Sequence, residues 1–183
     1  FTKRIQISAV STIISLAITA IVAYVFVHIS SIFGFGQSDA FILETGFLGS
    51  INLQGILLAG IIISVLGVLD DVTTAQTAAV EELDNTDSTL SVKNLYQKGL
   101  SIGREHIASL INTLILVYAG AALPLFLLLT LQNSQPLWIL MNSEFMAEEL
   151  VRALVGSIAL ILAVPLSTLL AAYIYASRSK DKS

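Results

Sequence analysis

A run of acidic and hydroxyl side chains interrupts the apolar residues near the middle of the chain. Asp70 and Asp71 directly follow the stretch GILLAGIIISVLGVL, and polar residues then recur at spacings of three and four, which is the repeat of a helix face. The residues of this polar stripe are Asp70, Thr73, Thr74, Thr77 and Glu81, with Asp71 beside them. One side of the predicted helix is therefore polar through half of its length.

Two adjacent carboxylates at the end of an apolar helix need a physical explanation. At 1.5 Å per residue from Asn52, Asp70 lies about 27 Å along the helix, near the inner edge of a membrane that the helix crosses upright. A carboxylate at the bilayer centre costs about 2.5 to 3.5 kcal/mol. Because neighbouring carboxylates in low dielectric repel each other, the pair could load a proton or hold a cation. The alternative is a solvated interfacial pair, or one paired with Lys93, Lys98 or Arg104.

A second polar group opens the next apolar segment, where Arg104 and His106 precede Asn112. In a functional site, Arg104 or His106 would be the counter-ion of the acidic pair and Asn112 would line a pathway. In the alternative interpretation, the first two mark the membrane interface and the amide of Asn112 hydrogen-bonds a neighbouring helix. Both interpretations stay open for all three residues.

Small residues recur before the acidic pair, and they would thin the outer half of the same helix. They are Gly55, Gly60, Ser64 and Gly67. Gly60 and Ser64 form a small-xxx-small pattern, which permits close contact between membrane helices. We therefore expect these residues to serve helix packing, with a glycine-lined substrate path as the alternative.

The chain lacks the residue patterns of the common catalytic and metal sites. It has no Cys and only two His, and it contains no phosphate loop, no H-E-x-x-H and no G-x-S-x-G. Two aspartates on one helix also differ from an aspartyl protease, whose carboxyls come from separate segments. We expect no enzyme activity, no catalytic residue, no cofactor and no metal site.

The composition is that of an integral membrane protein. Of the 183 residues, 55% are hydrophobic and 12% are charged, and the mean hydropathy is +0.85. Soluble proteins carry about 25% charged residues, so the apolar excess must face lipid. Segments long enough to cross a bilayer as helices span about 7–29, 53–83, 102–131 and 148–176. The sequence predicts an all-α, polytopic transmembrane bundle of four helices that forms a single domain over residues 1–183.

The positive charges predict the orientation, because Lys and Arg are retained on the cytoplasmic side. Eight of the nine fall before the first segment, between the second and third, or after the fourth: Lys3, Arg4, Lys93, Lys98, Arg104, Arg178, Lys180 and Lys182. The ninth, Arg152, lies inside the fourth segment. We therefore expect both termini in the cytoplasm. The net charge of −4 and the absence of a basic stripe argue against a nucleic-acid partner.

The stretches GILLAGIIISVLGVLDDVTTAQTAAVEEL and GLSIGREHIASLINTLILVYAGAALPLFLL resemble the YibE/F-like family of bacterial membrane proteins. The resemblance covers residues 1–178 and is most specific over 55–130. It implies a multi-pass protein of the bacterial plasma membrane with no established activity, and relatives with additional segments before the first helix. Because the first residue is Phe1 and not Met, we expect the chain to be part of a longer protein.

A shorter stretch is similar to the proton-relay region of resistance-nodulation-division exporters. There, an apolar helix with glycines runs into a pair of aspartates that carry the proton, and the next helix opens with G-R-x-x-x-x-S. Asp70 and Asp71 match the pair, Gly103 and Arg104 match the entry to the next helix, and Ser109 matches the small polar residue. None of the four expected spans contains a lysine, so the relay lysine of those exporters has no counterpart.

Two classes of function follow from these observations. The first is a transporter or permease module that uses Asp70 and Asp71 for proton or cation coupling. The second is a non-catalytic membrane subunit or scaffold that packs against other membrane segments or a partner protein. The expected partners are the lipid bilayer and either another membrane protein or a second copy of the chain. The surroundings of the two aspartates discriminate between the two classes.

Overall fold

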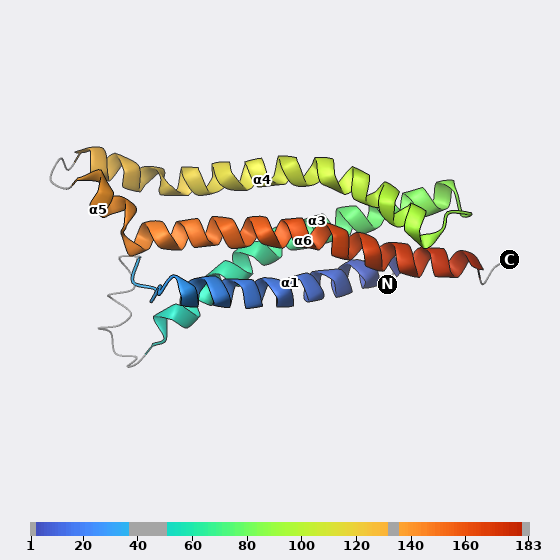
Figure 1. The fold of residues 1–183 in the computed structure, drawn as a ribbon, viewed down its shortest axis with the longest axis horizontal. Coiled ribbons are helices and arrows are strands. Elements are labelled where there is room, and N and C mark those ends of the chain that lie inside the picture. The colour runs from blue at the N-terminus through green and yellow to red at the C-terminus, as the bar shows by residue number, and fades with distance from the viewer. Residues whose placement is uncertain (1–2, 37–50, 132–135, 181–183) are drawn as a thin grey trace. The chain divides into compact units, whose positions relative to one another are not determined.

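The computed structural model describes residues 3–36, 51–131 and 136–180, and these contain helices and no strand (Figure 1). The helices are α1 (Lys3–Ile29), α3 (Leu53–Thr86), α4 (Val92–Leu131), α5 (Leu137–Met141) and α6 (Glu144–Lys180). The long helices α1, α3, α4 and α6 provide four segments that are long and apolar enough to cross a membrane. The predicted all-α membrane fold with four long helices is confirmed.

Polar side chains cap the starts of three helices. The side-chain oxygens of Asn52, Ser91 and Ser143 accept from the backbone N–H three residues later, over 3.0, 3.3 and 3.4 Å. These N–H groups belong to the first turn of α3, α4 and α6, where no helix carbonyl can reach them. The caps therefore determine where each helix begins.

A side-chain hydrogen-bond pair shapes the turn from α3 to α4. The Thr89 hydroxyl and backbone N–H both donate to Asp87 Oδ1, over 2.6 and 3.1 Å. The side-chain bond, and then the backbone bond, stabilise the carboxylate and hold the pKa of Asp87 below its ordinary value. This turn returns the chain to start α4 at Val92.

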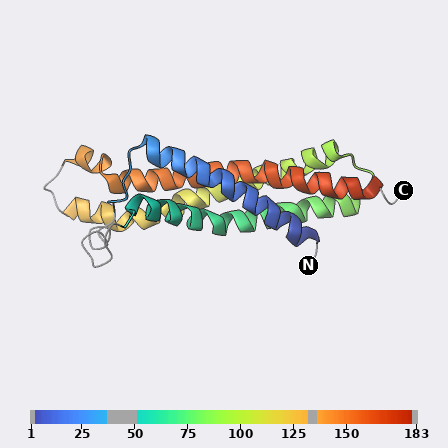
Figure 2. The same cartoon turned by 90° about the horizontal axis from the view of Figure 1, so that it is seen from below.

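The contacts divide the chain into two compact units, and each long helix contributes to both. The first unit contains Phe1–Ile18, Ser64–Ile111 and Ile158–Ser183. Its core of almost fully buried residues consists of Ile7, Val80, Leu95, Ala171, Ala172, Tyr175 and Ala176. Consistent with this core, the turn between α3 and α4 lies beside the C-terminal part of α6 in both views (Figure 2). Residues from all four long helices thus meet in this unit.

Two glycines of α4 permit its close packing within the first unit. A Cβ at Gly99 would lie 2.9 Å from Thr168 Cγ2 and 2.9 Å from Val80 Cγ2. A Cβ at Gly103 would collide with Val164 Cγ1 and lie 2.8 Å from Gln76 Oε1. Because lipid is as apolar as a leucine side chain, membrane helices associate through such close van der Waals contact. The pair at i and i+4 therefore seats α4 against α3 and α6.

The second unit contains Thr19–Ile63 and Asn112–Ser157, and carboxylates at the start of α6 hold the segment that follows α1. The backbone N–H groups of residues 33–35 donate to Glu144 Oε1 over 2.6, 2.7 and 3.2 Å. The N–H of Gly36 donates to Glu148 Oε1 over 2.9 Å, and Glu148 is only 2% exposed. Gly34 has a φ of +92°, a conformation that glycine adopts without strain. Two acidic side chains thus satisfy four successive backbone donors.

Candidate functional site

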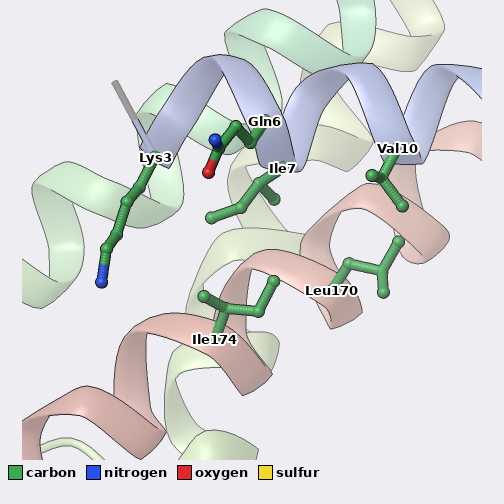
Figure 3. A pocket seen from close by; sticks show the side chains of 6 residues that line it. All are labelled: Lys3, Gln6, Ile7, Val10, Leu170 and Ile174. Atoms are coloured by element: carbon green, nitrogen blue, oxygen red, sulfur yellow. The ribbon is translucent and has the colours of Figure 1, made fainter. Parts of the chain in front are cut away.

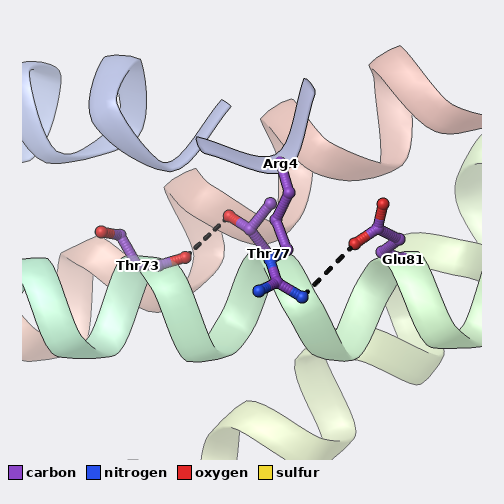
Figure 4. Close-up of polar contacts among 4 residues, drawn as sticks. All are labelled: Arg4, Thr73, Thr77 and Glu81. Carbon is purple, nitrogen blue, oxygen red and sulfur yellow. Dashed lines mark hydrogen bonds and ion pairs between the residues drawn. The ribbon is translucent and has the colours of Figure 1, made fainter. Parts of the chain in front are cut away.

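The polar stripe of α3 is divided between the interior and the surface of the first unit. Thr73 and Thr77 are both 0% exposed, whereas Asp70, Asp71 and Thr74 are exposed. The Thr73 hydroxyl lies 2.6 Å from that of Thr12 on α1, and the Thr77 hydroxyl donates to the Thr73 carbonyl over 2.7 Å (Figure 4). Thr73 therefore serves the contact between α1 and α3, and the Thr77 hydroxyl is satisfied within α3.

The face of α1 in this unit is also rich in hydroxyl groups. Ser8, Ser11 and Thr12 are buried, and each donates to a carbonyl of its own helix three or four residues earlier, over 3.1, 2.8 and 2.9 Å. Such bonds satisfy the hydroxyls within α1 and leave their oxygens free to meet a second polar group. This row of hydroxyls was not among the predicted site residues, although the sequence shows its spacing of three and four.

Gln76 bonds to two neighbouring helices of the unit, and it was not among the site residues predicted from the sequence. Its side chain is buried, and its amide nitrogen donates to the Gly99 carbonyl over 2.7 Å and to the Thr168 hydroxyl over 2.8 Å. A single amide therefore joins α3 to α4 and α6. Gln76 follows Thr73 by three residues, so its spacing carried a signal, but the predicted polar stripe included only threonines and carboxylates.

Glu81, at the C-terminal end of the polar stripe, lies beside a cation of α1. Its Oε2 lies 3.8 Å from Nη1 of Arg4 on α1, and the two side chains are 31% and 47% exposed (Figure 4). An ion pair with this exposure contributes little to stability because water screens it. The ion pair nevertheless gives the Glu81 carboxylate a counter-ion within the chain.

Asp70 and Asp71 remain without an ion pair among the residues that the structure describes. The Thr73 hydroxyl donates to the backbone carbonyl of Asp70 over 3.3 Å, and this bond does not involve either carboxylate. The pair therefore lies on the exposed side of α3, next to the buried threonines and without an ion pair to any cation in the described ranges.

The structure places Arg104 and His106 on the exposed side of α4, in the same unit as the acidic pair. His106 lines a groove of about 380 Å³ between α3 and α4, whereas neither aspartate nor Arg104 does. The lining residues are Ala75, Gln76, Ala79, Ile102, Glu105, His106 and Ser109. Asn112 is exposed and belongs to the second unit. The predicted counter-ion role of Arg104 or His106 thus stays a prediction.

The four small residues of α3 fall in both units, and the close helix contact occurs elsewhere. Gly55 and Gly60 belong to the second unit, and a Cβ at Gly60 would have Arg152 Nη1 at 3.9 Å as its nearest neighbour. Ser64 and Gly67 belong to the first, and a Cβ at Gly67 would meet no atom within 4 Å. The tight contacts are those of α4, and the packing role of the four residues stays a prediction.

The described residues contain no group of three or more His, Asp and Glu side chains close enough to hold a metal ion. The site itself offers two exposed carboxylates, with buried hydroxyl and amide groups on the same helix.

Comparison with known proteins adds the family. A family model described as YibE/F-like protein matches residues 1–177, which is nearly the whole chain. The chain belongs to the YibE/F-like family. The resemblance inferred from the two stretches around Asp70 and Arg104 is thereby confirmed. No curated protein and no solved structure matches this YibE/F-like protein.

Proposed function

We propose that this YibE/F-like membrane protein is a transporter or permease module of the bacterial plasma membrane, in which Asp70 and Asp71 couple transport to a proton or cation. The observation that carries the proposal is that both carboxylates, directly after the apolar run of α3, are exposed and form no ion pair with any described residue. By contrast, Glu81 lies beside Arg4, and Glu149 lies 3.6 Å from Arg152. A carboxylate with a purely structural role in a membrane helix takes such a partner, because an unpaired charge is costly there.

The neighbouring groups support this role chemically. Two adjacent carboxylates repel each other, and binding one proton or one cation relieves the repulsion. Thr73 follows the pair by two residues, and its hydroxyl contacts that of Thr12 on α1. Hydroxyls both donate and accept hydrogen bonds. The site can therefore change its charge without a rearrangement of a structural ion pair.

The test uses the purified chain in liposomes that contain a pH-sensitive dye. When a proton gradient is imposed, liposomes with the parent protein should lose it faster than liposomes without protein. The difference should appear both with and without Na⁺ outside. Asp70→Asn and Asp71→Asn should each reduce the flux at least tenfold at equal protein content. Glu82→Gln is the matched control, because Glu82 is an exposed carboxylate of the same helix, and it should leave the flux unchanged.

The outcomes separate the candidate roles of the pair. Full flux in the double Asn variant would show that the carboxylates are not a coupling site. Loss of expression or of thermal stability in the Asn variants, reproduced by Arg104→Gln, would instead indicate a structural role. If liposomes with the parent protein and liposomes without protein show equal flux, the proton-coupling hypothesis is wrong.

One observation favours the second candidate function, a non-catalytic membrane subunit or scaffold. Only 11% of the 18-residue apolar stretch of α4 is buried, compared with 44% of the corresponding stretch of α6. A helix this exposed presents most of its surface to lipid or to another membrane protein. A stable oligomer of the purified chain in native mass spectrometry, dissociated by Leu116→Arg on the exposed side of α4, would support the scaffold function.

A further inference from the structure

A groove on the first unit runs between the start of α1 and the last part of α6 (Figure 3). Ile7 and Val10 project from α1 toward α6, and Leu170 and Ile174 project from α6 toward α1. Lys3 and Gln6, from the first turns of α1, complete the lining. We call this hollow the α1–α6 groove.

The lining of the α1–α6 groove is apolar with one cationic end. Four of its six side chains are aliphatic, and none is a carboxylate. Lys3 is exposed and has no ion pair among the described residues, whereas the adjacent Arg4 is engaged by Glu81. An ammonium group at the end of a membrane helix extends to the level of the lipid headgroups. The groove therefore offers a cation at headgroup level and a hydrocarbon surface below it.

The volume of the groove restricts its ligand. It encloses about 270 Å³, which is slightly less than the roughly 300 Å³ at which sites for whole small molecules begin. A groove of this size on a membrane helix pair suits one part of a long molecule whose remainder lies in the bilayer.

We propose that the α1–α6 groove binds an anionic phospholipid, with its phosphate at the Lys3 ammonium and one acyl chain along Ile7, Val10, Leu170 and Ile174. Charge complementarity favours this occupant, because an apolar protein segment would leave the ammonium without a counter-ion. Gln6 provides a second donor for the phosphate or ester oxygens. Basic pockets between membrane helices are known to recognise lipid headgroups in this way. The proposal does not depend on Asp70 or Asp71.

The position of the groove gives the lipid a structural consequence. Ile7 belongs both to the groove and to the core that contains Tyr175 and Ala176 of α6. A bound acyl chain would fill the space beside this core and hold the start of α1 against α6.

The first experiment compares lipid affinities of the full chain by native mass spectrometry in a neutral detergent, with phosphatidylglycerol and phosphatidylcholine of equal chain length. The parent should prefer phosphatidylglycerol. Lys3→Gln should weaken phosphatidylglycerol binding about fivefold and remove the preference. Lys98→Gln, an exposed lysine of the same unit outside the groove, should change the affinity less than twofold. An equal affinity for both lipids, or an unchanged preference in Lys3→Gln, overturns the proposal.

The second experiment tests the acyl-chain half of the groove. Val10→Phe should fill the groove and weaken the binding of both lipids several-fold. Ile13→Phe, on α1 but outside the groove, should leave their binding unchanged. An equal effect of the two substitutions contradicts the assigned position of the chain. With Val10 replaced by a photoreactive benzophenone amino acid, illumination in membranes should attach a phospholipid. Attachment of a polypeptide, either a second copy or another protein, would show that protein covers the groove and would overturn the proposal.

Discussion

Gln76 is the residue at which three helices of the first unit share hydrogen bonds. It is 4% exposed, and its two donor contacts reach a backbone carbonyl of α4 and a hydroxyl of α6. An amide in this position satisfies groups that lipid cannot, so it contributes both to stability and to the register of the helices.

Replacement of Gln76 by leucine should therefore destabilise the protein by about 1 kcal/mol, because hydrogen bonds between membrane helices contribute about 0.6 kcal/mol on average and 1.7 at most. Unfolding in sodium dodecyl sulfate, followed by circular dichroism, measures the difference. Gln97→Leu is the control, because Gln97 is exposed on α4. Equal stability of the two variants would mean that the bonds of Gln76 contribute nothing net.

At this scale the sequence predicted which residues are polar but not how the stripe is oriented. At about 100° per residue, Thr73 lies about 60° to one side of Asp70 and Thr74 about 40° to the other. The stripe therefore straddles the boundary between buried and exposed surface, with Thr73 inside and Asp70 outside. In a helix whose other residues are apolar all round, periodicity cannot tell which edge of a polar stripe faces neighbouring helices.

At the scale of whole elements, α4 owes its position to glycine. Gly99 and Gly103 form a G-x-x-x-G pattern, whereas the predicted packing residues were the small residues of α3. Both helices carried a small-xxx-small signal, and the sequence does not show which of them meets a neighbour.

Substitution of alanine at Gly103 and at Gly67 should have opposite effects. Alanine in a helix is normally favoured over glycine by about 0.5 to 1 kcal/mol. Gly67→Ala should follow this rule because its Cβ meets open space, whereas Gly103→Ala should destabilise the protein because its Cβ collides with Val164. The same unfolding assay measures both, and stabilisation by Gly103→Ala would contradict the close packing of α4.

The carboxylates at the start of α6 should protect the segment after α1 in the second unit. Glu144→Gln removes the charge that three successive N–H groups share, and charge-assisted bonds are about twice as strong as neutral ones. Hydrogen exchange of the amides of residues 33–35 should accelerate at least tenfold. Glu82→Gln should leave the exchange rates of these amides unchanged. Unchanged rates in Glu144→Gln would contradict the hydrogen bonds to Glu144.

The helices extend beyond the apolar segments predicted from hydropathy, for a physical reason. Hydropathy locates the part of a helix that faces lipid, but backbone hydrogen bonding continues into water until a cap or turn stops it. Thus α4 begins at Val92, after the Ser91 cap and ahead of the apolar segment predicted from about residue 102, and α6 begins at Glu144, after the Ser143 cap and ahead of the segment predicted from about 148.

For the molecule as a whole, the positive charges are distributed between the units very unequally. The first unit holds eight of the nine Lys and Arg residues, and the second holds only Arg152. Because cations are retained in the cytoplasm, we expect the helix ends of the first unit that carry them to face the cytoplasm. With four crossings, by α1, α3, α4 and α6, this orientation would place both termini inside.

Cysteine labelling in intact cells tests this orientation, and the chain has no native Cys that would give a background. Asn142→Cys, in the connection from α5 to α6, should react with an impermeant thiol reagent added from outside. Ser88→Cys, in the turn from α3 to α4, should react only after the membrane is permeabilised, because Lys93, Lys98 and Arg104 follow it closely. Both positions are exposed, so reactivity after permeabilisation checks that each thiol is accessible. Labelling of Ser88→Cys in intact cells would invert the topology and place Asp87 and the charged start of α4 outside.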